Sequence, residues 1–285
     1  MSPSATSRQP LTEFLGGRTR AGDERSLLEV SDIVLRFEGV TAIDTVSFEV
    51  GPSELFAIIG PNGAGKTSIF NCLSGVYRPE SGAITFAGES LIGRRPHAIA
   101  KLGIARTFQN IELFANLTVL DNLMLGRHQH IGYGPAAAMF YAGKARREES
   151  RHREVVERII DFLDIENVRK APVSMLPFGI QKRVELGRAL AMAPRLLLLD
   201  EPVAGMNLEE REDMARFILD IKEELEIAIV LVEHDMGLVM DIADRVLAMD
   251  FGRQIAIGAP ESIQQDREVI RAYLGEQHES RGGES

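Results

Sequence analysis

One eight-residue stretch constrains the fold of this chain more than any other part of the sequence: Gly60-Pro61-Asn62-Gly63-Ala64-Gly65-Lys66-Thr67. An apolar run at 55–59 precedes it, and a helix-compatible run at 68–73 follows it. In the order strand, glycine-rich turn and helix, a G-x-x-x-x-G-K-S/T pattern predicts a loop that binds phosphate. We therefore expect an α/β protein that is built around this loop.

The residue types in the loop suit a nucleoside triphosphate. Glycine lets the backbone wrap closely around phosphate oxygens, and successive backbone N–H groups then form an anion-binding nest. The helix that follows adds the positive end of its dipole. We expect Lys66 to reach the β- and γ-phosphates, Thr67 to offer its hydroxyl to Mg²⁺, and Ser68 to belong to the nucleotide-binding set. The alternative is a glycine-rich turn followed by a surface lysine.

The chain is acidic overall, with a formal net charge of −10 over 285 residues. Sequence-independent binding to nucleic acid relies on lysine and arginine against phosphate, so this charge argues against nucleic acid as a partner. A basic cluster does occur between Lys144 and Arg153, but Glu148 and Glu149 interleave with it. We interpret the cluster as the solvated face of a helix, and the alternative is a patch for nucleic acid or lipid.

Cysteine usage, hydropathy and length bound the location and the number of domains. Cys72 is the single cysteine, expected in the core, so an intrachain disulfide is excluded and a cytosolic location fits. The sequence has no run that reaches the ~18 apolar residues of a membrane-spanning helix. The length predicts about two domains. Residues 1–26 lack the apolar segment of a secretory signal and are expected to be a disordered extension, and 276–285 a flexible tail.

The hydrophobic pattern predicts two kinds of strand. Residues 28–37 mix alternation with β-branched side chains, and residues 45–50 alternate cleanly, as a half-exposed antiparallel strand does. Residues 55–59 and 227–232 are continuously apolar, and in 195–199 four leucines follow Arg195. Such short runs are typical of strands in a parallel sheet that is buried on both faces.

Helical segments separate these strands. The stretch from about 96 to 190 is predicted to be mainly helical, because its apolar residues recur at helical spacing. Residues 245–249 and 253–257 are expected to be two edge strands, and the tail at 260–274 is expected to be helical. The prediction is thus an α/β fold over 27–275: a P-loop NTPase core with a mixed, mainly parallel sheet, an antiparallel β subdomain, and an α-helical subdomain inserted at about 96–190.

Polar side chains follow the ends of the predicted parallel strands. Asp200 and Glu201 follow the leucine-rich strand, and His234 follows the next buried strand. Because ligands of open α/β sheets lie outside the carboxyl ends of the strands, we expect these side chains beside the phosphate loop. Asp200 would hold Mg²⁺, Glu201 would orient or deprotonate water, and His234 would contact the γ-phosphate. Gln109, at the end of a predicted strand, offers an amide to the metal or the water. The alternatives are an acidic turn, a structural histidine and an ordinary glutamine.

Taken together, these residues resemble the ATP-binding subunit of ABC transporters over about 28–274. The resemblance implies ATP and Mg²⁺ as ligands, a catalytic glutamate at Glu201 and a switch histidine at His234. It implies that Gln109 links the helical subdomain to the metal and to membrane subunits. It also implies that Phe37, 66 − 37 = 29 residues before Lys66, stacks on adenine. The alternative for Phe37 is an ordinary strand residue.

The signature segment departs from the form that is common in this family. The family has Leu-Ser-Gly-Gly-Gln before a helix, and this chain has Leu176-Pro177-Phe178-Gly179-Ile180 followed by Gln181. In the family, the serine donates to the γ-phosphate of ATP held by a second subunit. Pro177 has neither a hydroxyl nor an N–H, so Gly179 and the helix N-terminus remain to face that anion. Asn207 likewise stands where the family commonly has aspartate.

Several runs resemble one branch of the family, the ATPases of branched-chain (hydrophobic) amino acid importers. The resemblance implies an ATPase that works with a second ATPase subunit, identical or related, with membrane permeases and with an extracytoplasmic solute-binding protein. It also implies a peripheral position on the cytoplasmic face of the inner (plasma) membrane. Importers of urea, amides and aromatic acids share this type; a soluble ABC-type ATPase and a protein that binds ATP without hydrolysis are further alternatives. The runs are Phe70–Gly75, Ala105–Asn110, Gly205–Asn207 and Ile270–Gly275.

Overall fold

The computed structural model describes most of the chain, in four stretches: Leu11, 26–107, 111–127 and 142–273, the last with side chains from Glu148 onward. Apart from Leu11 and Ser26, the expected N-terminal extension lies outside the described residues, as do the expected tail and Gln109. The chain divides into two compact units. Their described parts are 26–107 with 195–273 in the sheet-containing unit, and 111–127 with 142–194 in the helical unit.

A six-stranded sheet forms the centre of the sheet-containing unit. Strands β3 (Leu55–Ile59), β7 (Leu196–Asp200) and β8 (Ala228–Val232) are buried at every position. They run parallel, β8 pairing with both β3 and β7, which confirms the prediction from their continuous apolar runs. Their carboxyl ends therefore lie at one edge of the sheet. The order across the sheet is β10 (Arg253–Gly258), β9 (Arg245–Asp250), β3, β8, β7 and β6 (Ile104–Arg106).

A second sheet in the same unit is antiparallel. Val30 lies opposite Phe48 on one neighbouring strand and Ile84 on the other, and all three side chains are buried. The alternation of apolar and polar residues sets this register, because a one-residue slip would turn the apolar set toward solvent. The strand order is β2 (Val40–Val50), β1 (Leu28–Phe37), β4 (Ser81–Phe86) and β5 (Glu89–Ser90).

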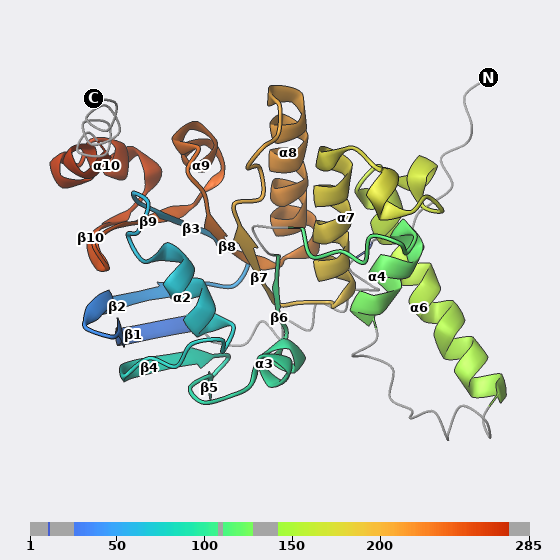
Figure 1. Ribbon diagram of the computed structural model, residues 1–285, viewed down its shortest axis with the longest axis horizontal. Helices are drawn as coiled ribbons and strands as arrows, with labels where there is room; N and C mark the ends of the chain where they lie inside the picture. The colour runs from blue at the N-terminus through green and yellow to red at the C-terminus, as the bar shows by residue number, and fades with distance from the viewer. Residues whose placement is uncertain (1–10, 12–25, 108–110, 128–141, 274–285) are drawn as a thin grey trace. The chain divides into compact units, whose positions relative to one another are not determined.

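One hydrophobic core joins the two sheets and helix α2 (Lys66–Leu73). Phe48 of the antiparallel sheet stacks on Phe56 of the six-stranded sheet, with ring centroids 5.1 Å apart. Phe70 of α2 is fully buried, and Figure 1 shows α2 next to β2. Cys72 is buried in α2 as expected, and burial raises the pKa of its thiol to about 12. The core thus fixes the helix that follows the phosphate loop.

Side-chain caps start two helices near the end of the parallel strands. Asn207 and Glu210 form a capping box at the start of α8 (Leu208–Leu225). Asparagine accepts a backbone N–H at this position as well as aspartate does, so the departure at Asn207 keeps the cap. Asp235 caps α9 (Met236–Ile242). The unit also contains α3 (Pro96–Leu102) and α10 (Pro260–Gln264).

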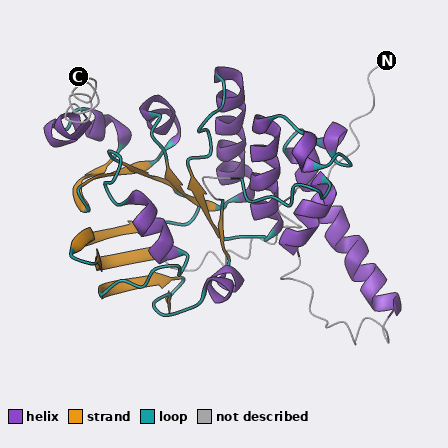
Figure 2. Ribbon diagram, in the orientation of Figure 1, coloured by secondary structure: helices purple, strands orange, loops and turns teal. Residues whose placement is uncertain are grey.

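The helical unit contains no strand among its described residues (Figure 2). Val155, Ile159 and Ile160 of its longest helix are buried, at the helical spacing that the sequence predicts. A Cβ on Gly187 would lie 2.9 Å from Leu163, so glycine lets the helices approach closely. The elements are α4 (Val119–Arg127), α6 (Ala142–Phe162), the short 3-10 helices η2 (Glu166–Val168) and η3 (Val173–Met175), and α7 (Phe178–Ala191).

One prediction about the C-terminal part was wrong. The strand at 245–249 is not at an edge, because β9 lies between β10 and β3 and pairs with β3 in parallel. The prediction that the tail is helical is confirmed over its described part, in two pieces: α10 and a helical segment at 267–273, with a break at 265–266 between them. The helical insert was expected to begin near 96. The helical unit instead begins after 109, because β6 pairs with β7 and joins the six-stranded sheet.

Candidate functional site

The loop between β3 and α2 adopts a backbone that requires glycine. Gly60, Gly63 and Gly65 have φ angles of 150°, 80° and 99°, a region that side chains disfavour. A Cβ on Gly60 would lie 2.3 Å from the carbonyl oxygen of Met249, and one on Gly65 would lie 2.5 Å from that of Ala42. Neighbouring backbone therefore packs directly against the loop and holds its shape.

Lys66 places a buried cation inside this loop. Its ammonium Nζ donates to the carbonyl oxygens of Gly60, at 2.7 Å, and Pro61, at 2.9 Å. Thr67 and Ser68 follow in the first turn of α2, with Thr67 exposed. A charge at this position, next to a helix N-terminus, favours an anion within the loop.

Asp200, at the end of β7, is joined to α2 by an arginine that the sequence analysis missed. Arg106 donates from Nη2 to Asp200 Oδ2 at 2.8 Å. Its other terminal nitrogen, Nη1, donates to Asn71 Oδ1 at 2.7 Å and to Ser74 Oγ at 3.0 Å. This guanidinium thus fixes the distance between the expected metal ligand and the phosphate-loop helix. The available signal was an arginine within an otherwise apolar strand.

Glu201 and His234, which follow neighbouring parallel strands, are in direct contact. Glu201 Oε1 lies 2.6 Å from His234 Nε2, and Glu201 has a positive φ of 49°. Such left-handed backbone at a non-glycine residue is strained and is typical of functional sites. The structure therefore brings the expected base and the expected γ-phosphate ligand together.

Glu233 is a second residue that the sequence analysis missed. Its buried carboxylate accepts from the backbone N–H of Val203 at 3.0 Å and from that of His234 at 2.9 Å. It therefore bridges the loop that follows Glu201 and the loop that carries His234. Burial, together with the charge of Glu201, raises the pKa of Glu233 despite the backbone hydrogen bonds. A glutamate directly after an apolar strand was the available signal.

Phe37 ends β1 with a partly exposed side chain. The side chain is 41% exposed, and its ring packs edge-on against Tyr77 with centroids 5.0 Å apart. The edge contact holds the ring in one orientation and leaves exposed area for a planar ligand.

The signature segment belongs to the helical unit. Pro177 is the N-cap residue of α7 and has no side-chain cap hydrogen bond. Gln181 donates from Nε2 to the carbonyl oxygen of Leu176 at 2.8 Å, which holds the segment against the first turn. Phe178 is exposed and Gly179 is buried. The hydrogen-bond donors at this helix end are therefore the backbone N–H groups of the first turn of α7, and Pro177 contributes none.

The described residues hold no group of three or more histidine, cysteine or acidic side chains that is suited to a metal ion. Mg²⁺ commonly takes one or two protein oxygens and completes its shell with phosphate and water. Asp200 and the exposed Thr67 at the start of α2 fit a site of this kind. They do not by themselves form a complete set of metal ligands. Of the expected ligands, Gln109 lies outside the described part of the chain.

The sheet-containing unit combines a glycine-rich loop around a buried lysine with carboxylates and a histidine at the ends of parallel strands. This combination defines a P-loop nucleotide-binding protein. A family model described as "ABC transporter" matches residues 43–204, and one described as "Branched-chain amino acid ATP-binding cassette transporter" matches residues 253–279. The chain therefore belongs to the ABC transporter family, as an ATP-binding cassette whose general activity is ATP hydrolysis.

Named relatives and solved structures match most of the chain. It is 38% identical over 252 residues to the high-affinity branched-chain amino acid transport ATP-binding protein BraF of Pseudomonas aeruginosa, covering 88% of this chain and 99% of BraF. It is 39% identical over 254 residues to LivG of Escherichia coli, described in the same words, covering 88% and 98%. The cassette MJ1267 of an ABC transporter in its ADP conformation aligns with a TM-score of 0.77 and 30% identity over 88% of this chain and 100% of that one. Among the described residues, no helix is long and apolar enough to cross a membrane.

Proposed function

We propose that this chain is the ATPase subunit that powers import of branched-chain amino acids through membrane permeases. The observation that carries the proposal is the similarity, over nearly the whole length, to BraF and LivG, whose names state branched-chain amino acid transport. The match of residues 253–279 to the branched-chain family model supports it independently. ABC importers for urea, amides or aromatic acids are the alternative.

The nucleotide-binding roles follow from the geometry of the sheet-containing unit. The loop from Gly60 to Ser68 cradles the triphosphate, with Lys66 against the β- and γ-phosphates. Phe37 stacks its exposed face on adenine. Thr67 and Asp200, with Gln109, hold Mg²⁺, which when bound neutralises developing charge on the phosphates. Arg106 keeps Asp200 at a constant position relative to α2.

The hydrolytic roles fall to the contacting pair at the ends of β7 and β8. Glu201 accepts a proton from water while the water oxygen forms a bond to the γ-phosphorus and the bond to the β–γ bridging oxygen breaks. His234 contacts the γ-phosphate and, through the 2.6 Å contact, orients the Glu201 carboxylate. Glu233 holds the two loops that carry this pair together, through its hydrogen bonds to the backbone of Val203 and His234.

A second ATPase subunit, identical or related, completes each site. Its signature segment, equivalent to 176–181, faces the γ-phosphate held here, and this chain's segment faces the ATP of the partner. Because Pro177 has no donor, backbone N–H groups at the start of α7 and the helix dipole supply the attraction. Binding of ATP then closes the pair, and hydrolysis reopens it, which biases the permeases between two states.

The remaining assignments follow from this role. The chain comprises an ABC-type ATP-binding domain at 27–275, with the helical subdomain inserted into it. Its partners are membrane permeases and an extracytoplasmic solute-binding protein, so it lies peripherally on the cytoplasmic face of the inner membrane. Met175, beside the signature segment, is 77% exposed, as expected of a residue that a partner covers.

The catalytic assignment is tested by Glu201→Gln, which removes the base and keeps the shape. We expect ATP affinity within about twofold of wild type and turnover lowered by at least about a hundredfold, the usual contribution of a general base. Glu212→Gln, at an exposed position of α8, is the matched control and should hydrolyse normally. Hydrolysis at the wild-type rate by Glu201→Gln would overturn the assignment.

The transport assignment is tested in cells. A strain that lacks this chain should lose uptake of radiolabelled leucine, and the wild-type chain, but not Glu201→Gln, should restore it. Unchanged leucine uptake in that strain, with loss of urea or amide uptake, would replace the proposed solute by the alternative one.

A further inference from the structure

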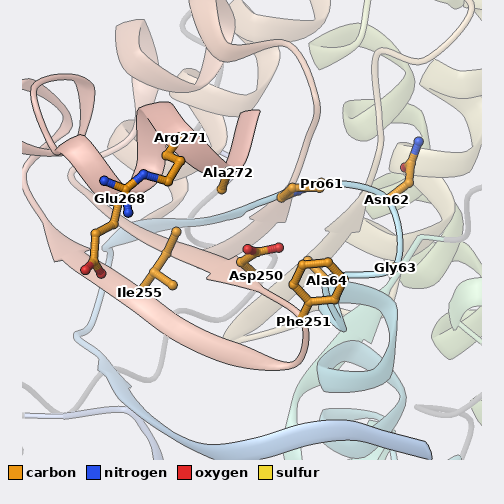
Figure 3. Close-up of a pocket in the computed structure, with 10 residues that line it drawn as sticks. All are labelled: Pro61, Asn62, Gly63, Ala64, Asp250, Phe251, Ile255, Glu268, Arg271 and Ala272. Carbon is orange, nitrogen blue, oxygen red and sulfur yellow. The ribbon is translucent and has the colours of Figure 1, made fainter. Parts of the chain in front are cut away.

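A cavity of about 550 Å³ lies beside the phosphate loop in the sheet-containing unit. Figure 3 shows the residues that line it, which come from the phosphate loop, from the β9–β10 hairpin and from the C-terminal helical segment. Lys66, Asp200 and Glu201 do not line it. Its volume is within the range of sites for small molecules, about 300–1,000 Å³. The lining residues are Pro61, Asn62, Gly63, Ala64, Asp250, Phe251, Ile255, Glu268, Arg271 and Ala272.

Glu268 and Arg271, which carry opposite charges, line one wall of the cavity, and the local sequence holds this wall in place. Asp266 accepts from the backbone N–H of Glu268 at 2.8 Å and of Val269 at 3.1 Å, which caps the helical segment at 267–273. Val269 is buried and anchors one face of this segment. Glu268 and Arg271 are three residues apart, so they share the face that lines the cavity. The charged wall is thus held by a cap and a buried anchor.

The lining chemistry selects against a nucleotide and for a zwitterion. Arg271 is the single cation among the lining residues, whereas Glu268 and Asp250 are both acidic. A polyphosphate would meet more negative than positive charge. A guanidinium pairs with a carboxylate through two parallel hydrogen bonds, and a carboxylate accepts from an ammonium. Ile255 and Phe251, whose side chain is 84% exposed, add apolar surface.

We propose that this cavity binds a free apolar α-amino acid. Its α-carboxylate pairs with Arg271, its ammonium with Glu268, and its side chain lies against Ile255, which Figure 3 shows beside this charged pair. Ile255, Glu268, Arg271 and Ala272 all fall within residues 253–279, the part that matches the branched-chain family model. That the ligand is a branched-chain amino acid rests on the proposed function, because the imported solute would then be the ligand on the cytoplasmic side.

The cavity is coupled to the ATP site through backbone contacts. Gly252, in the β9–β10 turn, donates its N–H to the carbonyl oxygen of Ala64 at 3.1 Å. The carbonyl oxygen of Met249 packs where a side chain on Gly60 would lie. Both ends of the phosphate loop therefore rest on the strand and turn that line the cavity. An occupant changes ATP affinity through this contact, and ATP changes the affinity of the occupant by the same factor.

The binding step is tested by calorimetric titration of L-leucine into the purified full-length chain. We expect saturable binding, and about tenfold weaker binding or worse for isoamylamine, which lacks the carboxylate, and isocaproate, which lacks the ammonium. Arg271→Gln should lower leucine affinity by a similar factor. Arg267→Gln is the matched control, because Arg267 is exposed on the same helical segment and does not line the cavity.

Two results would overturn the proposal: no binding of leucine up to about 10 mM, or equal leucine affinity in Arg271→Gln and Arg267→Gln. The coupling is tested by fluorescent ATP binding with and without saturating leucine, where an affinity that leucine leaves unchanged contradicts it. These outcomes are separate from the proposed function. Leucine uptake that depends on this chain, without leucine binding to it, would refute the cavity's role alone, whereas loss of both would refute the function too.

Discussion

Replacing Arg106 by methionine should destabilise the protein more than any comparable change at an exposed ion pair. The side chains of Arg106 and Asp200 are only 10% and 4% exposed, so water screens their interaction weakly. Breaking a buried pair by removing one partner costs about 3–5 kcal/mol, because the remaining charge stays buried without its counterion. The same change removes the hydrogen bonds to Asn71 and Ser74.

Arg36 provides the matched control. Its pair with Glu80 has a similar distance, 3.0 Å, but the side chains are 53% and 47% exposed. Such a pair contributes under about 1 kcal/mol, so Arg36→Met should change little. Arg106→Lys keeps the charge and loses the planar fork, so an intermediate loss of about 1.5–3 kcal/mol is expected.

The assay is equilibrium unfolding in urea, which yields the free energy of unfolding of each variant. Arg106→Met should also weaken ATP binding, since Asp200 and α2 lose their common anchor. The reasoning is refuted if the losses in Arg106→Met and Arg36→Met agree within about 0.5 kcal/mol. A double variant with Asp200→Asn should recover part of the loss, because the uncompensated charge is then absent.

Two further outcomes are expected. Burial raises the folded-state pKa of Glu233 above its ordinary value of 4.5. The stability that Glu233 contributes is therefore fully present below pH 4.5 and is lost as the pH rises through the raised pKa. Glu233→Gln should flatten this fall in the free energy of unfolding with pH, and an unchanged slope would exclude Glu233 as the source of the fall. Gly65→Ala should abolish ATP binding, because the new Cβ would lie 2.5 Å from the carbonyl oxygen of Ala42. Gly39→Ala is the control, because Gly39 has a similar φ and a Cβ there would meet nothing within 4 Å. It should lower the free energy of unfolding by about 1–2 kcal/mol and bind ATP normally.

Local pattern in the sequence was sufficient to predict the class of fold. The continuous apolar runs at 55–59, 196–199 and 227–232 require a sheet covered on both faces, and β3, β7 and β8 form one. The glycines from Gly60 to Gly65 predict a loop with positive φ angles, and the loop adopts them. These features depend on neighbours within a few residues, so no knowledge of distant contacts was needed. The roles assigned to Lys66 and Glu201 remain predictions, and Glu201→Gln tests the role of Glu201.

Tertiary structure decided which distant segments meet. β9 follows β8 in sequence but pairs with β3, so a run that predicts an edge strand becomes an internal one. Arg106 bonds to Asp200 across 94 residues, and the cavity unites the phosphate loop with a helical segment about 200 residues later. Hydrophobic pattern states only that a strand is buried, and the order of strands determines its neighbours. The sequence by itself therefore determined the loop and the strands around it, whereas the residues that support and adjoin the loop depended on the packing of the whole unit.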